Sequence, residues 1–208
     1  MKAPFITIEG VEGAGKSTQA ARVAAHLEAR GVPCLALREP GGTELGEKLR
    51  DLILNDTHIA MEAGTETLLL MASRRELIDR AIRPALEAGR VVLCDRFIDS
   101  TLAYQGYGRG LGADWIRRLF DLSCHGFYPD LTLLLDLPVE EGRERLRRPL
   151  NDRFEREEHA FHERVREGFL SIAGTEPERV QAVPAHGSGD EVFERVLGCL
   201  RRRFGTIF

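Results

Sequence analysis

The stretch Gly10-Val11-Glu12-Gly13-Ala14-Gly15-Lys16-Ser17 decides the fold. It fits the pattern G-x-x-x-x-G-K-[ST] at every fixed position, and it stands between a β-rich run, Phe5–Ile8, and a segment with helical spacing, Ser17–Arg30. Glycines permit a tight turn whose N–H groups approach phosphate oxygens, and the following helix start adds partial positive charge. The motif therefore predicts a nucleoside triphosphate site, with Lys16 on the β and γ phosphates and the Ser17 hydroxyl on Mg²⁺.

Beyond this loop, short β-rich runs alternate with longer helical stretches. The expected strands are Phe5–Ile8, Cys34–Leu37, Val91–Cys94, Leu131–Leu135 and Val180–Val183. The expected helices are Ser17–Arg30, Leu45–Leu54, Glu66–Ala88, Ala113–Cys124, Val139–Arg147, Glu155–Ala173 and Glu191–Arg203. Three strands are nearly continuous apolar runs, as expected for strands covered on both faces. The alternation predicts an α/β fold, in which a parallel five-stranded sheet is flanked by helices in three layers. We expect one domain over residues 1–208.

Composition narrows the range of partners. The chain has 208 residues, of which 43% are apolar and 30% charged, so it is globular rather than disordered. A net charge of -4 argues against a nucleic-acid partner, and the absence of a long apolar run argues against a membrane partner. The four cysteines are far apart and form no C-x-x-C, which favours neither a disulfide framework nor a zinc site, so we expect a cytoplasmic protein.

A second acidic signal supports the phosphate loop. The apolar run Val91–Cys94 ends in Asp95, the arrangement of a strand whose carboxylate orders Mg²⁺ or its water shell. Asp136, at the end of Leu131–Leu135, is a rival, although a turn former before Pro138 is the favoured interpretation.

Three classes of protein use such a loop. A GTPase switch needs Asn-Lys-x-Asp, but neither Asn55 nor Asn151 is followed by Lys. An ATPase module needs partner-coupling segments, for which the chain has little room. A small-molecule kinase needs arginines that hold an anionic acceptor and a lid that excludes water. Such arginines are found at Arg38, at Arg96 and at positions 147, 148 and 153, although solvated surface charge stays open for each, least so for Arg96.

Taken together, the motifs resemble the bacterial thymidylate kinase family. The matching pieces are Glu9–Thr18, Arg38–Thr43, Asp95–Phe97, Ala103–Gly106, Pro129–Asp136 and Asp152–Glu155. The resemblance implies the nucleoside monophosphate kinase form of the P-loop fold and transfer of the ATP γ-phosphoryl group to dTMP with Mg²⁺, giving dTDP and ADP. It also implies a homodimer. A kinase for another small acceptor, or a nucleotide-regulated P-loop binding module, is the alternative.

The resemblance also implies roles for residues. The ATP site would comprise Gly10, Val11, Glu12, Gly13, Ala14, Gly15, Lys16, Ser17 and Thr18, with Ser17 and Asp95 on the metal ion. The dTMP site would comprise Glu12, Glu39, Pro40, Arg50, Leu70, Arg74, Arg96, Ser100, Thr101, Tyr104 and Gln105. In it, Glu12 would accept the sugar 3′-hydroxyl, Arg96 and Arg50 would hold the 5′-phosphate, and Arg74 would bond the thymine edge.

Catalysis is expected from Lys16, Arg96, Arg153 and Arg148. The phosphate loop has no Arg, so a lid at about 143–155 should supply one, and Arg153 is the first choice because it lies in the matching Asp-Arg-Phe-Glu. Two further features concern the base. Arg75 could point inward in place of Arg74, and Leu70 stands where the family commonly has an aromatic ring that stacks on thymine.

Overall fold

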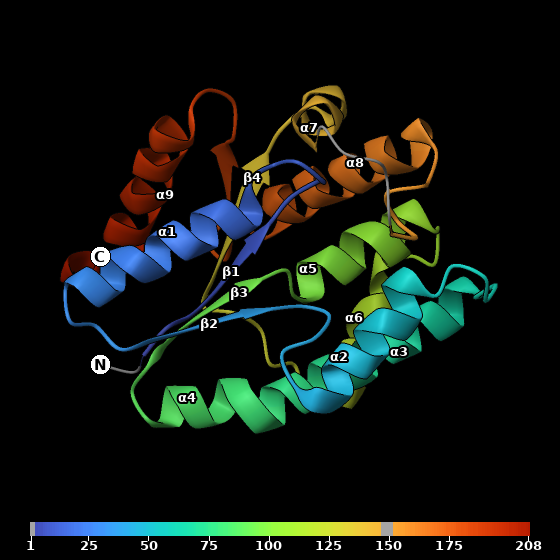
Figure 1. Ribbon diagram of the computed structural model, residues 1–208, viewed down its shortest axis with the longest axis horizontal. Helices are drawn as coiled ribbons and strands as arrows, with labels where there is room; N and C mark the ends of the chain where they lie inside the picture. Colours follow the sequence, from blue (N-terminus) through green and yellow to red (C-terminus); the bar gives the residue numbers. More distant parts are fainter. Residues whose placement is uncertain (1–2, 147–151) are drawn as a thin grey trace.

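The computed structural model describes residues 3–146 and 152–208, and a five-stranded parallel sheet forms its centre (Figure 1). The strands are β1 Phe5–Glu9, β2 Cys34–Arg38, β3 Val91–Asp95, β4 Leu131–Asp136 and β5 Val180–Pro184, in the order β2-β3-β1-β4-β5. The predicted parallel five-stranded sheet is confirmed. Each strand ends one residue later than expected, so Glu9 and Asp95 belong to β1 and β3.

Helices connect the strands. They are α1 Lys16–Ala29, α2 Glu44–Arg50, α3 Ala63–Leu77, α4 Arg83–Glu87, α5 Ile98–Thr101, α6 Ala113–Cys124, α7 Val139–Leu146, α8 His159–Thr175 and α9 Gly189–Phe204. Single π-helical turns extend α2 over Asp51–Asn55 and α5 over Leu102–Gly108, another joins α3 to α4 over Ile78–Ile82, and a short 3-10 turn, Gly205–Ile207, ends the chain. The segment expected as one helix over Glu66–Ala88 is thus α3, a π turn and α4 in succession.

The sheet lies between two helical layers. Helices α1 and α9 cover one face, while α4, α5 and α8 pack on the other (Figure 1). Successive residues of a strand point to opposite faces, so Phe5 joins the apolar core on one side and Ile6 the core on the other, both almost fully buried. Each face of the sheet is covered by an apolar core. Residues that point to either face are therefore apolar, which explains the continuous apolar runs of three of the strands.

One expected helix begins later than predicted, and one helical segment was not predicted. Residues 155–158 do not belong to α8, which begins at His159. The Asp152 carboxylate accepts hydrogen bonds from the backbone N–H groups of Phe154 (2.9 Å) and Glu155 (2.8 Å), and this side-chain turn competes with helix formation. The helical segment 98–108 was missed because its small and polar residues give no amphipathic repeat, although it is almost entirely buried.

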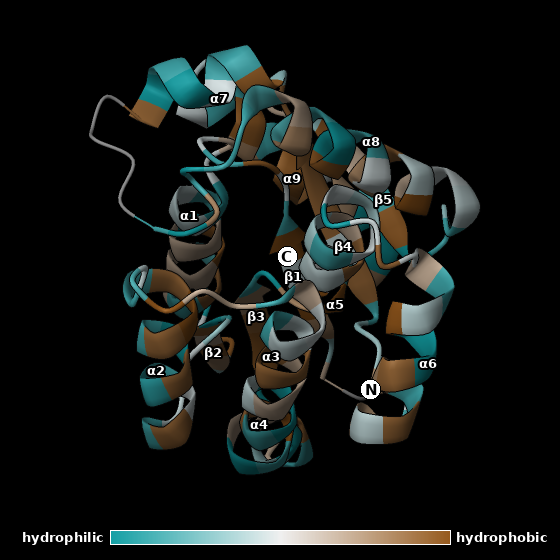
Figure 2. Ribbon diagram, turned by 90° about the vertical axis from the view of Figure 1, so that its right-hand side faces the viewer, coloured by the Kyte–Doolittle hydropathy of each residue, from teal (hydrophilic) through white to brown (hydrophobic). Residues whose placement is uncertain are grey.

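The carboxyl ends of the strands share one edge, which Figure 2 views from the front with α7 at the top and α2 and α3 below. Both chain ends lie near the opposite edge (Figure 1). Within residues 3–146 and 152–208, no helix combines the length and apolar character needed to cross a bilayer. All four cysteines are free thiols.

Candidate active site

The phosphate loop follows β1 directly, and its last two residues, Lys16 and Ser17, are the first two residues of α1. Gly15 has a φ of 91°, which only glycine adopts readily, and a Cβ on Gly13 would lie 2.0 Å from the Gly142 carbonyl oxygen of α7. The Lys16 ammonium is almost buried and donates to the Val11 carbonyl oxygen at 2.8 Å. The lysine therefore lies across the loop, where a phosphate group bound by the loop would meet it.

The predicted metal ligands are brought together. Ser17 Oγ, at the start of α1, donates to Asp95 Oδ2, at the end of β3. Two small oxygen donors beside a phosphate loop are the ligand type that Mg²⁺ prefers, so these residues fit the ion. The rival carboxylate, Asp136, accepts from Arg166 Nε at 2.9 Å and from its Nη2 at 3.2 Å, so its two oxygens already hold a guanidinium.

Arg96 lies at the centre of the polar contacts. It follows β3, and its φ of 71° turns the side chain back over the neighbouring loop. Its guanidinium donates to the carboxylate of Glu12, to Ser100 Oγ at 3.0 Å and to the Gly10 carbonyl oxygen at 3.3 Å. The hydroxyl of Tyr104 also donates to Glu12 Oε1, at 3.1 Å. One arginine thus connects the phosphate loop with the segment after β3.

The charge on Glu12 is fixed by this contact. Burial alone would raise the pKa of Glu12, but the Arg96 guanidinium and the Lys16 ammonium outweigh it and lower the pKa to about 2. The carboxylate is therefore ionised near neutral pH and can only accept hydrogen bonds. A carboxylate of this kind suits a sugar hydroxyl, which donates.

Glu9, the last residue of β1, binds the segment that follows β3. It was not predicted as a site residue. It is fully buried, and its carboxyl group accepts from the Phe97 N–H at 2.7 Å and from Ser100 Oγ at 2.6 Å. Burial, with the nearby Asp99 carboxylate, raises the pKa of Glu9 to about 8. In the sequence, Glu9 is an acidic residue that follows an apolar strand and begins the matching piece Glu9–Thr18, and neither feature indicates a role for its side chain.

Arg74 resolves the choice between adjacent arginines. It is 2% exposed, and its Nε donates to Glu39 Oε2 at 2.8 Å while Nη2 donates to Thr101 Oγ1 at 3.0 Å. Arg75 instead forms an ion pair with Asp79 at the surface. The second Glu39 oxygen is buried without a partner, and burial raises the pKa of Glu39 to about 7 against the lowering effect of Arg74.

A cleft of about 620 Å³ lies along this edge of the sheet. The predicted residues that line it are Glu12, Gly13, Ala14, Gly15, Lys16, Ser17, Thr18, Glu39, Pro40, Arg50, Leu70, Arg74, Asp95, Arg96, Ser100, Thr101, Tyr104 and Gln105. Gly10 and Val11, at the start of the loop, do not line the cleft. The other lining residues are Gln19, Arg38, Leu54, Phe97, Arg145, Leu146, Asp152, Phe154, Glu155, Gly187, Gly189 and Val192. One continuous cleft therefore joins the phosphate loop to the Arg74 region.

The structure places the Arg153 side chain outside the cleft. Its Nε donates to the Ile53 carbonyl oxygen at 2.9 Å, and its Nη2 to those of Asp56 (3.0 Å) and Ile59 (2.9 Å). It does not line the cleft, and the structure does not bring it to Lys16. Its catalytic role stays a prediction, and Arg148 lies outside the described residues. Among the described lid arginines, Arg145 lines the cleft.

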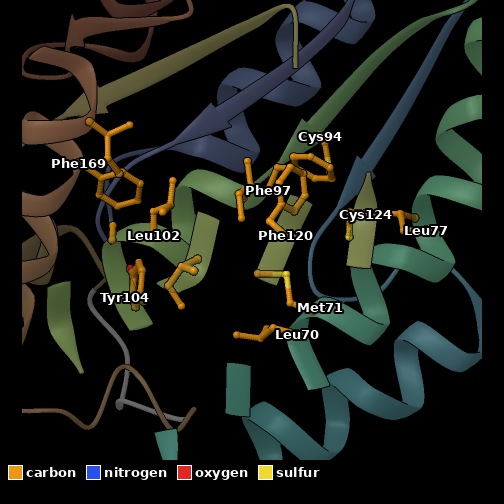
Figure 3. Close-up of a cluster of buried hydrophobic side chains, with 14 of the residues drawn as sticks. Leu70, Met71, Leu77, Cys94, Phe97, Leu102, Tyr104, Phe120, Cys124 and Phe169 are labelled. Carbon is orange, nitrogen blue, oxygen red and sulfur yellow. The ribbon is translucent and has the colours of Figure 1, made fainter. Parts of the chain in front are cut away.

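The floor of the Arg74 region is apolar. Leu70 and Met71 of α3 lie with Phe97, Phe120 and Tyr104 in one buried cluster (Figure 3). Leu70 is 7% exposed and also lines the cleft, so its side chain offers an apolar surface to a flat ligand there. It supplies no aromatic ring for stacking.

The parallel sheet, the phosphate loop and a second, arginine-lined pocket in the same cleft define a P-loop phosphotransferase. Comparison with known proteins narrows this class. A sequence model of the family described as Thymidylate kinase matches residues 8–196. A thymidylate kinase of Synechococcus sp. (strain JA-3-3Ab) is 49% identical over 199 residues, covering 96% of each chain. One from Alkalilimnicola ehrlichii is 50% identical over 183 residues, covering 87% of this chain and 84% of its own.

A solved structure agrees. The thymidylate kinase of Ehrlichia chaffeensis superposes with a TM-score of 0.79 at 36% identity, covering 97% of this chain and 99% of its own. The chain belongs to the thymidylate kinase family.

Proposed function

We propose that this chain transfers the γ-phosphoryl group of ATP to dTMP, giving dTDP and ADP. The observation that carries the proposal is the single cleft that joins Lys16 and the phosphate loop to the pocket around Arg74 and Gln105. Family membership supports the same reaction. Donor and acceptor nucleotides would enter from opposite ends, and their phosphates would meet between Lys16 and Arg96.

The donor side is built on α1. Backbone N–H groups of residues 13–18 and the Lys16 ammonium would hold the phosphates, and Ser17 and Asp95 would hold Mg²⁺. Mg²⁺, when bound, neutralises charge on the β and γ phosphates. Gly187, Gly189 and Arg145 also line the cleft, and we assign them to the adenine end of the donor site.

The acceptor side is built on α3 and the segment after β3. Arg96 and Arg50 would hold the 5′-phosphate, and Glu12 would accept the sugar hydroxyl. Arg50 currently donates to the Pro40 carbonyl oxygen at 2.8 Å, so it is held at the cleft wall. Arg74 and Gln105 would meet the base edge, with Leu70 on its face.

Catalysis would be mainly electrostatic. The attacking oxygen belongs to a phosphate that is already ionised near neutral pH, so no general base is needed. Two anions must approach one another, and Lys16, Arg96 and arginines of the lid at about 143–155 would offset their repulsion. The acceptor phosphate would also compete with Glu12 for the Arg96 guanidinium, which releases the carboxylate toward the sugar.

We also propose that the protein is a cytoplasmic homodimer. Free cysteines fit a reducing compartment. Two apolar side chains on the adjacent helices α3 and α6, Leu68 and Leu122, are 54% and 80% exposed, which suits a contact with a second copy. Light scattering coupled to gel filtration measures the mass directly, and a monomer of 23.3 kDa would contradict the dimer.

A screen of acceptors tests the reaction. ADP release is followed with ATP, Mg²⁺ and, separately, dTMP, dUMP, CMP, AMP or shikimate. We expect the highest kcat/KM with dTMP and no turnover in Lys16→Ala. A clear preference for another acceptor would identify a different kinase. Tight ATP binding without turnover of any acceptor would instead indicate a binding module.

A further inference from the structure

The amide of Gln105 is held in one orientation. Gln105 is 1% exposed and lines the cleft, and its Nε2 donates to Glu66 Oε1 at 2.9 Å. An ionised carboxylate has no proton to donate, so the amide nitrogen must face Glu66. The amide oxygen is then the polar atom that Gln105 can offer to a ligand in the cleft.

Glu66 is itself fixed from the other side. It lies in the first turn of α3 and is 1% exposed. Arg109 Nη2 donates to Glu66 Oε2 at 3.2 Å and Arg109 Nε to Glu66 Oε1 at 3.3 Å, a bidentate contact. A buried carboxylate needs such a partner, and both oxygens of Glu66 act as acceptors, from Arg109 and from Gln105.

Arg109 cannot turn easily. Its third contact runs from Nη1 to Glu157 Oε1 at 2.5 Å, and its guanidinium lies 4.9 Å from the centre of the Phe161 ring. Glu157 belongs to the turn before α8, so the contact joins that turn to the π-helical segment that carries Gln105. The side chains of Glu66, Arg109 and Glu157, which lie on separate elements, therefore determine the orientation of the Gln105 amide.

We propose that Glu66, held by Arg109, is a positioning residue that makes Gln105 a hydrogen-bond acceptor toward the base, and so selects a pyrimidine with an N–H at position 3. Thymine carries this donor, whereas cytosine has an acceptor nitrogen there. The inference rests on the proposed function, because it names the feature of the acceptor base that the pocket recognises. Neither Glu66 nor Arg109 needs to touch the nucleotide.

The variant Glu66→Gln tests the orientation directly. A glutamine at 66 offers both an oxygen and an N–H₂ group, so the Gln105 amide can turn over and present its own N–H₂ to the cleft. We expect the ratio of kcat/KM for dTMP to that for dCMP to fall about tenfold, which is the effect of about one hydrogen bond. The KM for ATP should not change, because the donor side is untouched.

Two further variants complete the experiment. Asp79→Asn is the matched control, since it also neutralises one carboxylate of an Arg–acid pair, on the turn that follows α3 and away from the cleft; its ratio should equal that of the wild type. Arg109→Lys keeps the charge but loses the bidentate contact, and should lower the ratio by a smaller factor. It serves as the test if Glu66→Gln does not fold.

The outcomes separate the two proposals. If the wild type does not phosphorylate dTMP, the proposed function is wrong. If the wild type prefers dTMP and a folded Glu66→Gln keeps the same ratio, with both values of kcat/KM lowered equally, the positioning role is wrong and the proposed function stands. Should Glu66→Gln not fold, an unchanged ratio in Arg109→Lys overturns the positioning role instead.

Discussion

The guanidinium of Arg96 donates to the carboxylate of Glu12, although 84 residues separate them. Their side chains are only 17% and 23% exposed. The pair holds the segment after β3 against the phosphate loop, so the proposed acceptor and donor sites share one contact. Within the protein, the positive charge of Arg96 and the negative charge of Glu12 also compensate each other.

Removing one partner of this pair should cost more than removing both. We expect Arg96→Ala to raise the KM for dTMP at least about 100-fold, because a charged hydrogen bond to phosphate contributes about 1.5–3 kcal/mol and the lost arginine makes more than one. It should also lower the melting temperature, since Glu12 would be left without its guanidinium. Glu12→Gln in the same chain should recover part of the melting temperature but not the KM. Additive effects on stability would contradict a direct coupling between the two side chains.

Glu9 should make stability depend on pH. Its pKa is about 8 in the folded protein against an ordinary value of 4.5, so between these pH values the folded state holds a proton that the unfolded state has lost. Its stabilising contribution is complete below pH 4.5 and is lost as pH rises through 8. The free energy of unfolding should fall by up to about 1.4 kcal/mol per pH unit across this range on account of Glu9.

Denaturant unfolding at several pH values measures this slope. Glu9→Gln removes the titrating proton while it keeps the shape of the side chain, so its slope should be flatter than that of the wild type. Equal slopes would show that Glu9 does not titrate in this range.

Two effects are predicted for the loss of the Arg153 side chain. We expect Arg153→Ala to lower kcat by orders of magnitude with little change in the KM for dTMP, because the phosphate loop has no arginine of its own. The variant also loses contacts to three carbonyl oxygens, so its melting temperature should fall as well.

Arg156→Ala is the control for that experiment. Arg156 Nη1 donates to Thr57 Oγ1 at 3.2 Å, which joins the same turn to the same loop. Its loss should change stability slightly and leave kcat as it is. A lowered melting temperature with unchanged kcat in Arg153→Ala would make Arg153 an anchor of the turn and remove it from catalysis.

Leu70 should set the affinity for the base. An aromatic ring at this position would add a stacking contribution of about 0.5–1.5 kcal/mol, so Leu70→Phe should lower the KM for dTMP about two- to tenfold. Leu68→Phe places the same ring on the exposed face of α3 and should not change the KM. A higher KM in Leu70→Phe would mean that the buried cluster has no room for the ring.

Much of this arrangement follows from the sequence. The phosphate loop fixes a strand before it and a helix after it, and the five β-rich runs became the five strands. Asp95 and Arg96 follow β3, which pairs directly with β1, so their approach to Ser17 and Glu12 follows from parallel pairing.

Other parts depend on contacts that no local pattern encodes. The inward position of Arg74 rather than Arg75 is decided by Glu39 and Thr101, which come from other elements. Glu66 reads as an ordinary acid in a first helical turn, and only Gln105 and Arg109 show why it is buried. Arg153 was placed by its motif, whereas carbonyl oxygens of the distant segment 53–59 determine where its guanidinium lies.

The strand order places the proposed reaction at the edge formed by the carboxyl ends of the strands. The opposite edge has no role in that reaction. At that opposite edge, the tight bends at Gly31 and Gly89 have open space where a side chain would begin. The bends precede β2 and β3, and the chain ends lie nearby (Figure 1). Evolution or an engineer can therefore lengthen these bends, or attach a second protein there, and leave the spacing between the reacting phosphates as it is.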